Sequence, residues 1–564
     1  MPPRHRPRDA TKPVVVAAVA LGAFAVGLGD QHVWSYDEAR PGLVARDVLY
    51  GHWLVPHLGG ALYPDKPPLF AWIVALLSPR GVSEWSLRLP AAVAAAATVG
   101  VTCAIATRVA GGVAGLVAAA TLAGSPAFVH WARTGRMESL LVLWLALTFW
   151  SALAWLDTTA RRHAALAGVW MGLGVLTKGP FALLPVPAVA IVRLARRADR
   201  VTWFGVAIGL GATVGVPAAW LALCVIVDPT GLVTYGRAAI QAFTEEIAAR
   251  RPRPSSFGII TVAAGFFPWT LLLPGAAVLL VRSGRHARRL LALPLAWIAV
   301  VAVLLTVVVS PRESYLLMLY PPLAILVGWA WSTAAGRARL LLAAPLGIAV
   351  VGCAIVGVAA IATPLSVETH GVGVLLDARF GATLLVLVAT AASATVALAR
   401  AGRMAHAGTV LGAAVLCAVL LVEIHVYTPA VNQRFPTRAV AAGFARAAPP
   451  DAITVLYVDR QRAPALMFYL PQRPLKVRSI ADLRARLAGS DGAGSILTLL
   501  PRTQLEGLQS AGCRPARVAH EDQINGVSYV LAEFRSGSEC PPIGSVAVAG
   551  PSDLGPMVTG SSGR

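Results

Sequence analysis

The chain has 564 residues, of which 57% are hydrophobic and 13% are charged, and its mean hydropathy is +0.68. Soluble domains carry about 25% charged residues, so this composition excludes a soluble globular protein and indicates a polytopic membrane protein. The formal net charge is +21, from 48 Lys and Arg residues against 27 Asp and Glu residues. This excess fits basic cytoplasmic loops and anionic lipid, and also an anionic substrate. Because the basic residues are spread over many loops, we expect no nucleic-acid partner.

The N-terminus is basic over residues 1–12, "MPPRHRPRDATK", and an apolar segment follows it. A secretory signal peptide has the same order of segments. However, no A-x-A-like cleavage site comes before "GDQHVWSYDE". We therefore expect an uncleaved first span, with its basic end in the cytoplasm.

Apolar runs of about 17 to 25 residues recur along the chain, and this is the length that crosses a hydrocarbon core of roughly 30 Å. We predict a transmembrane domain over residues 13–427. Its helices, about thirteen by this length criterion, are expected at residues 13–29, 90–108, 112–130, 137–155, 164–178, 180–194, 202–227, 259–282, 289–309, 315–333, 338–361, 381–399 and 407–427. With the N-terminus inside, nearly every compact basic loop also falls inside, as the positive-inside rule requires.

The opposite face receives the long first loop, residues 30–89, which is too long to be a simple connector. Two of its stretches, "ARDVLYGHWLVPHL" and "PPLFAWIVALL", predict short interfacial helices. The same face receives "HWARTGRMES", "LTKGPF", "AFTEEIAARRPRP" and "SPRESY". Many of these charges are positive on the side where positive charge is disfavoured, which indicates an anionic partner.

An odd number of spans places residues 428–540 outside the cytoplasm as well. In this region the strand-like runs "AITVLYV" and "SILTLL" alternate with the helix-like runs "TRAVAAGFARA" and "SIADLRARLAG", which predicts a small extracytoplasmic α/β domain. Cys513 and Cys540 are candidates for a disulfide there, and the sequence does not decide whether they pair. The tail 541–564 is rich in Gly, Ser and Pro and is expected to be disordered.

The stretch "SYDEAR" follows the first span and contains Asp37, Glu38 and Arg40. Ser35 with Glu38 three residues later fits a capping box, and acidic residues suit a helix N-terminus. This structural explanation covers Ser35 and Glu38 but leaves Arg40 unexplained. A function for Asp37 therefore depends on whether other charged clusters reach the same face.

Other clusters allow both a structural and a functional interpretation. "LYPDKPPLF" places Lys66 beside a double proline, which fits a turn with a snorkelling lysine or a phosphate-binding cation. "ARTGRMES" and "TKGP" place Arg133, Arg136, Glu138 and Lys178 at the outer ends of spans. An ion pair between Glu138 and Lys178 explains the last two residues as well as ligand contact does.

Two further stretches extend the cluster, because "AARRPRP" offers Arg251 and "SPRESY" offers Arg312 and Tyr315. A ring of cations around a carboxylate at the membrane surface fits a lipid phosphate that is joined to a reactive group. The cations can stabilise a departing phosphate, and the carboxylate can remove a proton from an attacking hydroxyl. An aspartate with a pKa near 4 is a weak base, which suffices for a good leaving group such as an anomeric phosphate. The sequence has no nucleotide-binding motif, which favours a lipid-carried donor.

These stretches resemble a known family. "SYDEARPGLVARDVLYGHWLVPHLGGALYPDKPPLFAWIVALL" and "LRLPAAVAA" resemble the first outer loop of the bacterial GT-C glycosyltransferases related to the lipid A aminoarabinose transferases and, more distantly, to protein O-mannosyltransferases. "GLGVLTKGPFALLP", "GFFPWTLLLP" and "SYLLMLYPPLAILVG" are similar to later stretches of that family in the same order. The resemblance covers roughly residues 30–330.

The resemblance implies an inverting transferase of the cytoplasmic membrane, active on its outer face. It moves a hexose or pentose from polyprenyl phosphate to a lipid, glycan or protein acceptor, as in lipid A modification or protein mannosylation. By match to the motif, Asp37 is the catalytic base. The residues implied to bind the donor phosphate are Arg40, Lys66, Arg251, Arg136, Lys178 and Tyr315. The residues implied to shape the loop and the substrate site are Glu38, Tyr63, Asp65, Glu138 and Arg312.

Two positions depart from the family's pattern. Pro41 follows "DEAR" where family members commonly have tyrosine, and Glu245 and Glu246 stand where related sequences often have histidine. Asp65 and Glu246 are the weak candidates for a metal site, because their oxygen ligands suit a hard divalent ion. We expect no required cofactor, and the sugar and acceptor stay open.

Two other functions compete with a transferase. A transporter or flippase for an anionic lipid-linked substrate is the main alternative, although that class often has internal repeats and charges at the bilayer midplane, and neither is visible here. A receptor with a ligand-sensing C-terminal domain is a third interpretation. The number of predicted spans is far larger than anchoring such a domain requires.

Overall fold

The computed structural model describes most of the chain. The described residues are 11–196, 203–248, 256–307, 312–363, 365–369, 372–448, 455–457, 463–470, 475–476, 481, 483–484, 487 and 495–535. The chain divides into two compact units. The first contains Met1–Leu58 and Leu62–Phe435, and the second contains Gly59–Ala61 and Pro436–Arg564.

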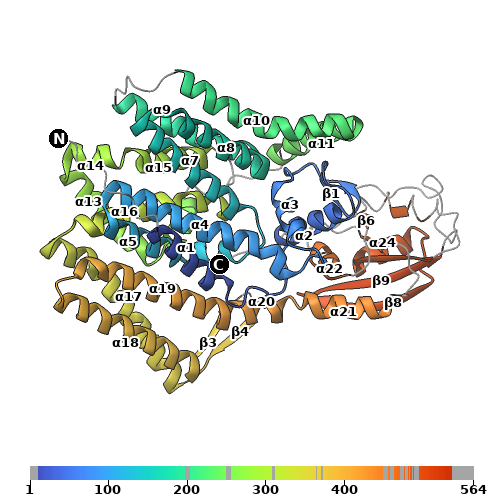
Figure 1. The fold of residues 1–564 in the computed structure, drawn as a ribbon. Coiled ribbons are helices and arrows are strands. Elements are labelled where there is room, and N and C mark those ends of the chain that lie inside the picture. Colours follow the sequence, from blue (N-terminus) through green and yellow to red (C-terminus); the bar gives the residue numbers. More distant parts are fainter. Residues whose placement is uncertain are drawn as a thin grey trace. The chain divides into compact units, whose positions relative to one another are not determined.

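The first unit is built mainly of helices (Figure 1). Its α-helices are α1 (Thr11–Ala25), α2 (Tyr36–Leu49), α3 (Leu69–Leu76), α4 (Glu84–Ala110), α5 (Gly112–Ala123), α6 (Pro126–Ala132), α7 (Glu138–Thr158), α8 (Arg161–Lys178), α9 (Pro185–Arg196), α10 (Trp203–Val227), α11 (Pro229–Ala248), α12 (Ser256–Gly265), α13 (Leu273–Arg282), α14 (Gly284–Leu290), α15 (Ala292–Val307), α16 (Tyr320–Thr333), α17 (Gly336–Ala362), α18 (Ala378–Arg400), α19 (Ala407–Val422) and α20 (Thr428–Arg434). Short helical turns are η1 (Gly179–Leu183), η2 (Trp269–Leu272), η3 (Glu313–Leu319), η4 (Met404–His406) and η5 (Glu423–Tyr427), and short strands are β1 (His57–Leu58), β3 (Leu365–Thr369) and β4 (Val372–Leu376). A further short strand, β2 (Ala61–Leu62), begins in the segment Gly59–Ala61 that is assigned to the second unit.

The helices confirm that the chain is a multi-pass membrane protein. Within the described ranges, eight helices are long and apolar enough to cross a membrane, and there are up to eleven spans if each bent helix pair counts as one. The bent pairs are α5 with α6, the segment Phe257–Gly265 with Trp269–Arg282, and α14 with Ala292–Leu305. Two shorter apolar helices, Thr11–Ala25 and Pro185–Leu194, lie where further spans are predicted.

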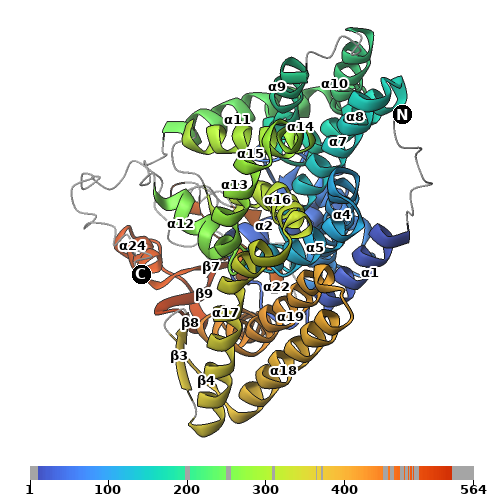
Figure 2. The ribbon, with the colours of Figure 1, turned by 90° about the vertical axis from the view of Figure 1, so that its left-hand side faces the viewer.

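The centre of the first unit is formed by α4, α5 and α16, which pack against one another. Small residues allow this close approach. A Cβ atom on Gly328 of α16 would lie 2.4 Å from the carbonyl oxygen of Ala114 in α5, so only glycine fits there. In Figures 1 and 2, the α8–α10 group and the α17–α19 group lie on opposite sides of this centre.

The first outer loop contains α2 and α3. Helix α3 lies within the predicted stretch "PPLFAWIVALL". The predicted helix over "ARDVLYGHWLVPHL" is wrong in its bounds, because α2 begins earlier, at Tyr36, and ends at Leu49. The Ser35 side chain caps α2 by accepting a hydrogen bond of 3.2 Å from the Glu38 N–H, as the capping motif predicts. After Tyr50 the chain turns at Gly51, whose φ of +106° favours glycine.

The Glu38 carboxylate does not turn back onto the cap but forms a buried ion pair with Arg88 of α4. Arg88 Nε lies 2.7 Å from Glu38 Oε1, and the two residues are 1% and 2% exposed. Arg88 also donates to the carbonyl oxygens of Leu28 and Gln31 at 2.9 and 2.8 Å. The Gly135 N–H donates to Glu38 Oε1 at 2.9 Å. This pair therefore joins α2 to α4, to the chain that follows α1, and to the loop before α7.

The second unit contains a mixed sheet with helices. Its helices are α21 (Thr437–Ala447), α22 (Ala463–Tyr469) and α24 (Arg502–Ser510), and its strands are β5 (Val455–Tyr457), β6 (Leu475–Lys476), β7 (Ser495–Pro501), β8 (Arg517–Ile524) and β9 (Val527–Arg535). In the described part, the strand order is β6-β5-β7-β9-β8. Strands β6, β5 and β7 are parallel, and β9 is antiparallel to both β7 and β8.

The local elements of the second unit coincide with several sequence patterns. Helix α21 covers "TRAVAAGFARA", β5 lies within "AITVLYV", and β7 begins at the predicted "SILTLL". Most of "SIADLRARLAG" lies outside the described residues. Cys513 is disulfide-bonded, while Cys540 and the tail 541–564 lie outside the described residues.

We expect Glu38→Gln to destabilise the first unit strongly. The substitution leaves the Arg88 charge buried without its carboxylate, and breaking a buried ion pair typically costs about 3–5 kcal/mol. The measurement is the temperature at which half of the detergent-solubilised protein leaves the monodisperse peak in size-exclusion chromatography. The expected result is a clearly lower temperature than for the unsubstituted protein.

The matched control is Asp157→Asn, which removes a carboxylate that pairs with Arg108 but is 42% exposed. Exposed pairs contribute about 0–1 kcal/mol, so this variant is expected to remain close to the unsubstituted protein. Equal stability of the Glu38→Gln and Asp157→Asn variants would show that the buried pair does not hold α2 in place.

Candidate active site at the start of α2

Asp37 lies on the first turn of α2 and is bordered by guanidinium groups from separate segments. Arg40 of the same helix is ion-paired with Asp37 Oδ1. Arg136, in the loop before α7, and Arg312, immediately before η3, each place Nη1 at 3.3 Å from Asp37 Oδ2. Three stretches far apart in the sequence, "DEAR", "ARTGRMES" and "SPRESY", thus meet at one carboxylate.

These cations decide the protonation state of Asp37. Burial favours the neutral carboxyl group, but the positive charges of Arg136, Arg40 and Arg312 outweigh this effect and hold the pKa of Asp37 below its ordinary value. The carboxylate is therefore ionised at neutral pH. Its side chain is 28% exposed, so it can reach a ligand from outside the protein.

Arg40 connects Asp37 to the second half of the first outer loop. Its Nη1 lies 3.2 Å from Asp65 Oδ2. The guanidinium also lies over two aromatic rings, 4.2 Å from the centroid of Tyr36 and 6.0 Å from that of Tyr63. Asp65 and Tyr63 therefore lie beside Arg40, and the role in shaping this loop that the resemblance implies for them stays a prediction.

A second carboxylate, Glu138 at the start of α7, lies behind Arg136 and is 5% exposed. Its Oε1 is 2.9 Å from Arg136 Nη2 and 2.9 Å from Lys178 Nζ, and it accepts a hydrogen bond of 3.0 Å from the Ser314 hydroxyl. Lys178 lies 4.3 Å from the centroid of the Tyr315 ring. The structural ion pair between Glu138 and Lys178 is thus present, and it also orients Arg136 toward Asp37.

Lys66 belongs to the same charged region. Its ammonium group and that of Lys178 repel each other, and its backbone carbonyl accepts a hydrogen bond of 3.3 Å from the Tyr235 hydroxyl. Arg251 lies outside the described residues. Glu246 belongs to α11, but its side chain also lies outside the described part of the structure.

The described site has more positive than negative groups. The cations Arg40, Lys66, Arg136, Lys178 and Arg312 outnumber the carboxylates, which come from three residues, Asp37, Asp65 and Glu138. Each of these carboxylates is already bonded by a guanidinium or an ammonium group. The remaining positive charge favours an anion, and a phosphate accepts hydrogen bonds from several such donors at once.

The carboxylates of the site are poorly arranged as metal ligands. Asp65 is bonded to Arg40, and Glu138 is enclosed by Arg136, Lys178 and Ser314. Among the residues that the structure describes, no group of three or more His, Cys, Asp or Glu side chains is placed to hold a metal ion. The described donor set therefore fits an anion better than a divalent cation.

Three residues correct or extend the sequence prediction. Arg133, which the sequence places in the same cluster as Arg136, instead donates to the carbonyl oxygens of Phe24 and Val26 at the end of α1. Arg88 and Ser314 support the site, but the sequence motifs did not indicate them. Arg88 could have been found as a charge within the long apolar helix α4, since such charges are usually paired. Ser314 offers no sequence signal, because a serine at a span's end is common.

Comparison with known proteins relates the chain to membrane glycosyltransferases. The sequence model of the family described as dolichyl-phosphate-mannose-protein mannosyltransferase matches residues 65–221. An undecaprenyl phosphate-α-4-amino-4-deoxy-L-arabinose arabinosyl transferase of Pectobacterium carotovorum is 26% identical over 362 residues, which are 58% of this chain and 61% of the relative. The enzyme of the same name from Pseudomonas aeruginosa is 28% identical over 55% of this chain and 58% of its own length. The chain thus spans about three fifths of these relatives.

Solved structures extend the likeness to almost the whole chain. The crystal structure of ArnT from Cupriavidus metallidurans bound to undecaprenyl phosphate has a TM-score of 0.71 and 19% sequence identity, over 93% of this chain and 98% of ArnT. The same protein in the apo state has a TM-score of 0.70 and 20% identity, over 92% and 97% of the two chains. The chain is thus similar in sequence to aminoarabinose arabinosyl transferases over part of its length, and it has the GT-C fold of ArnT.

Proposed function

We propose that this chain is an integral-membrane glycosyltransferase that moves a pentose or hexose from a polyprenyl-phosphate donor to a hydroxyl group of an envelope acceptor. One observation carries the proposal: the partly exposed Asp37 carboxylate lies among Arg40, Arg136 and Arg312. Such a transfer needs a carboxylate that accepts a proton and cations that stabilise a departing phosphate. The names of the relatives support an undecaprenyl-phosphate donor, as does the ligand of the ArnT structure.

The reaction is a single displacement at the anomeric carbon. The acceptor oxygen attacks this carbon on the face opposite the phosphate, and Asp37 takes the hydroxyl proton. A new carbon–oxygen bond forms to the acceptor while the bond to the phosphate oxygen breaks. The phosphate leaves with the electron pair, and the neighbouring guanidinium groups stabilise its growing negative charge. The configuration at the anomeric carbon is inverted.

Asp37 and the donor phosphate compete for the same arginines. Without donor, these arginines hold the pKa of Asp37 low, which makes its carboxylate a weak base. A bound phosphate withdraws guanidinium groups from Asp37 and adds negative charge beside it. Both effects raise the pKa of the carboxylate. The base thus becomes stronger when the donor is in place.

We propose that this site lies on the outer face of the membrane, and the distribution of spans and basic ends supports this topology. Eight long helices, three bent pairs and two shorter apolar helices together provide the thirteen crossings of the proposed topology. The exposed Arg161 and Arg162 begin α8 at the end opposite Lys178, and Arg282 ends α13 beside the basic α14. The positive-inside rule assigns these ends to the cytoplasm.

The same topology makes the second unit an extracytoplasmic α/β domain. Its first helix, α21, follows the last apolar helix, α19, after η5 and α20. The disulfide at Cys513 supports an oxidising compartment, since disulfides are rare in the cytosol. In this topology the chain leaves the membrane near residue 428, where the sequence predicts that the extracytoplasmic domain begins.

The function is tested by mass spectrometry of glycolipids, envelope glycans and glycoproteins. Cells that lack this protein are compared with cells that regain it. The proposed function predicts that one glycosylated species disappears and returns with the protein. An unchanged set of glycosylated species would contradict a transferase and would favour transport of a lipid-linked substrate.

We expect Asp37→Asn to lower the rate of sugar transfer by roughly 10²–10⁴-fold, the usual contribution of a general base. The same substitution is expected to tighten binding of undecaprenyl phosphate, because the competing carboxylate is removed from the arginines. The measurements are transfer by the purified protein and binding of the lipid phosphate. Asp157→Asn, at a site away from these arginines, is the control and should change neither quantity. Full transfer activity, or weaker binding of the lipid phosphate, would contradict the role of Asp37.

We expect chelation of divalent ions to leave the transfer rate unchanged. Asp65 and Glu138 are already bonded by cationic side chains rather than available to a metal ion. The cationic side chains stabilise the negative charge of the phosphate, which a metal would otherwise do. The measurement is the transfer rate of purified protein before and after dialysis against EDTA, with magnesium or manganese added back. A loss that the added ion restores would show that the site needs a metal.

A further inference from the structure

Helix α20 lies beside the stretch that precedes α2, and the Asn432 side chain bonds to the backbone of that stretch twice. Asn432 Oδ1 accepts a hydrogen bond of 2.7 Å from the His32 N–H, and Nδ2 donates one of 2.9 Å to the Asp30 carbonyl oxygen. In an extended chain, the carbonyl group of one residue and the N–H group two residues later point to the same side. One amide group therefore holds the chain on both sides of Gln31. We call this pair of hydrogen bonds the Asn432 clamp.

Two contacts at the end of α20 act on the same stretch. The rings of Trp34 and Phe435 are stacked, with centroids 4.6 Å apart and an angle of 15° between their planes. The His32 ring nitrogen Nδ1 lies 3.2 Å from the carbonyl oxygen of Phe435. The clamped stretch ends directly before Ser35, whose side chain caps α2. The place of the first turn of α2 therefore depends on α20.

Helix α20 is itself held in place through η5, which it follows without a break in the chain. Glu423 Oε1 in η5 lies 3.1 Å from His130 Nδ1 in α6. The Tyr427 ring meets the His130 ring edge to face, with centroids 5.2 Å apart. Helix α6 leads into the loop that carries Arg136. The segment from η5 to α20 thus contacts both stretches that meet at Asp37.

The clamp and Arg88 hold the stretch before α2 at different residues. Arg88 Nη1 donates a hydrogen bond of 2.8 Å to the Gln31 carbonyl oxygen, whereas the clamp holds the residues on either side of Gln31. Together these contacts set the direction in which the chain enters α2. Asp37 Oδ2 lies 3.3 Å from Arg136 Nη1. A displacement of this turn by about 1 Å away from Arg136 is enough to break that contact.

We propose that Asn432 is a positioning residue for the proposed sugar transfer. It touches no reacting group itself. By clamping the backbone at Asp30 and His32, it keeps the first turn of α2 in register, so that the Asp37 carboxylate stays at Arg136 and faces the acceptor hydroxyl. This inference rests on the proposed function, because its effect on the rate passes through Asp37. Misplacing a reacting group by about 1 Å can lower a rate by roughly 10²-fold.

The first test is independent of sugar transfer. Hydrogen–deuterium exchange of the purified full-length protein in detergent is followed by mass spectrometry. Asn432→Ala is expected to speed exchange of the backbone amides in residues 30–39 by about fivefold, which corresponds to the loss of an ordinary hydrogen bond. Exchange in the central helix α16 should not change. Unchanged exchange over residues 30–39 overturns the proposal.

The second test compares the effect of Asn432→Ala on the transfer rate with and without the Asp37 carboxylate. In the unsubstituted background we expect kcat to fall by roughly 10- to 100-fold. In the Asp37→Asn background we expect less than about a twofold further fall, since two changes that act through one group are not additive. An equal loss in both backgrounds would show a general structural role and overturns the proposal. If the unsubstituted protein transfers no sugar, the proposed function fails, and the exchange experiment still decides whether the clamp holds α2.

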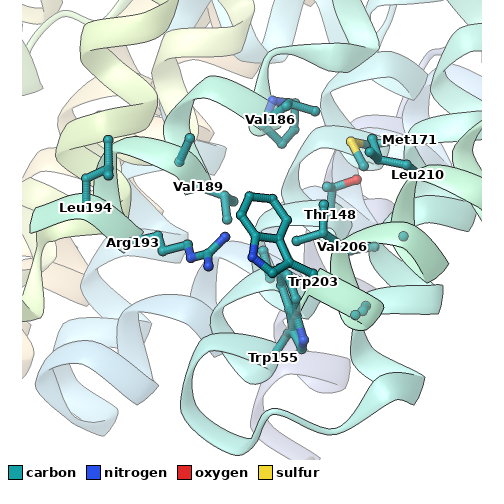
Figure 3. Close-up of a pocket in the computed structure, with 17 residues that line it drawn as sticks. Thr148, Trp155, Met171, Val186, Val189, Arg193, Leu194, Trp203, Val206 and Leu210 are labelled. Atoms are coloured by element: carbon teal, nitrogen blue, oxygen red, sulfur yellow. The ribbon is translucent and has the colours of Figure 1, made fainter. Parts of the chain in front are cut away.

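Two control variants should change neither exchange over residues 30–39 nor the transfer rate. Gln433→Ala alters the exposed neighbour of Asn432 on α20. Thr148→Ala removes another hydrogen bond between a side chain and the backbone, in which the Thr148 hydroxyl donates to the Trp144 carbonyl oxygen at 2.8 Å. Thr148 lines an apolar hollow between α7 and α10 (Figure 3), whereas Glu138 of the Asp37 site is at the start of α7.

Asn432→Asp keeps the test decisive if Asn432→Ala fails to fold. Aspartate has nearly the same shape and still accepts the hydrogen bond from the His32 N–H, but it cannot donate to the Asp30 carbonyl oxygen. We expect faster exchange over residues 30–39 and a lower kcat, each by a smaller factor than for alanine. Exchange and kcat equal to those of the Gln433→Ala control would overturn the proposal.

Discussion

The buried ion pair between Glu38 and Arg88 fixes the start of α2, and the site depends on this constraint. Successive residues on a helix point about 100° apart because there are 3.6 residues in each turn. Once Glu38 is directed into the protein toward α4, its neighbour Asp37 must point elsewhere. The direction that remains is toward the guanidinium groups of Arg136 and Arg312. The adjacent carboxylates of "DEAR" thus have separate tasks, one structural and one available for chemistry.

The arginines near Asp37 are held by a second buried group. Arg136 is shared between Glu138, which is enclosed, and Asp37, which is partly exposed. Glu138 is also bonded by Lys178, so it can keep Arg136 in place when Asp37 releases it. In the proposed reaction, an incoming phosphate finds a guanidinium that is already oriented, and preorganised charges of this kind favour a transition state in which negative charge develops.

The apolar spans were largely predictable from the sequence because hydropathy is a local property. The cap at Ser35 was predictable for the same reason, since it joins residues three positions apart. The ion pair between Glu138 and Lys178 was predicted as one of two alternatives, from the expectation that charges at the outer ends of neighbouring spans meet. Such inferences need only the order and length of the helices.

Other features depend on contacts that no local pattern encodes. Glu38 was correctly placed at a helix start, but its partner Arg88 is fifty residues away in α4, so the pair requires the packing of α2 on α4. The amphipathic stretch that was predicted as a helix begins at Ala45, whereas the capping motif at Ser35 marks the start that α2 has. Arg133 was grouped with Arg136 by proximity in sequence, but it closes the end of α1 instead.

The proposed sugar transfer can be tested by following donor and product with the purified protein in liposomes. An undecaprenyl-phosphate-linked sugar is supplied with an acceptor, and nuclear magnetic resonance determines the anomeric configuration of the product. We expect undecaprenyl phosphate to be released one for one with transferred sugar, and the configuration to be inverted relative to the donor. A product with retained configuration, or a donor that crosses the bilayer with its sugar still attached, would contradict the proposed transfer.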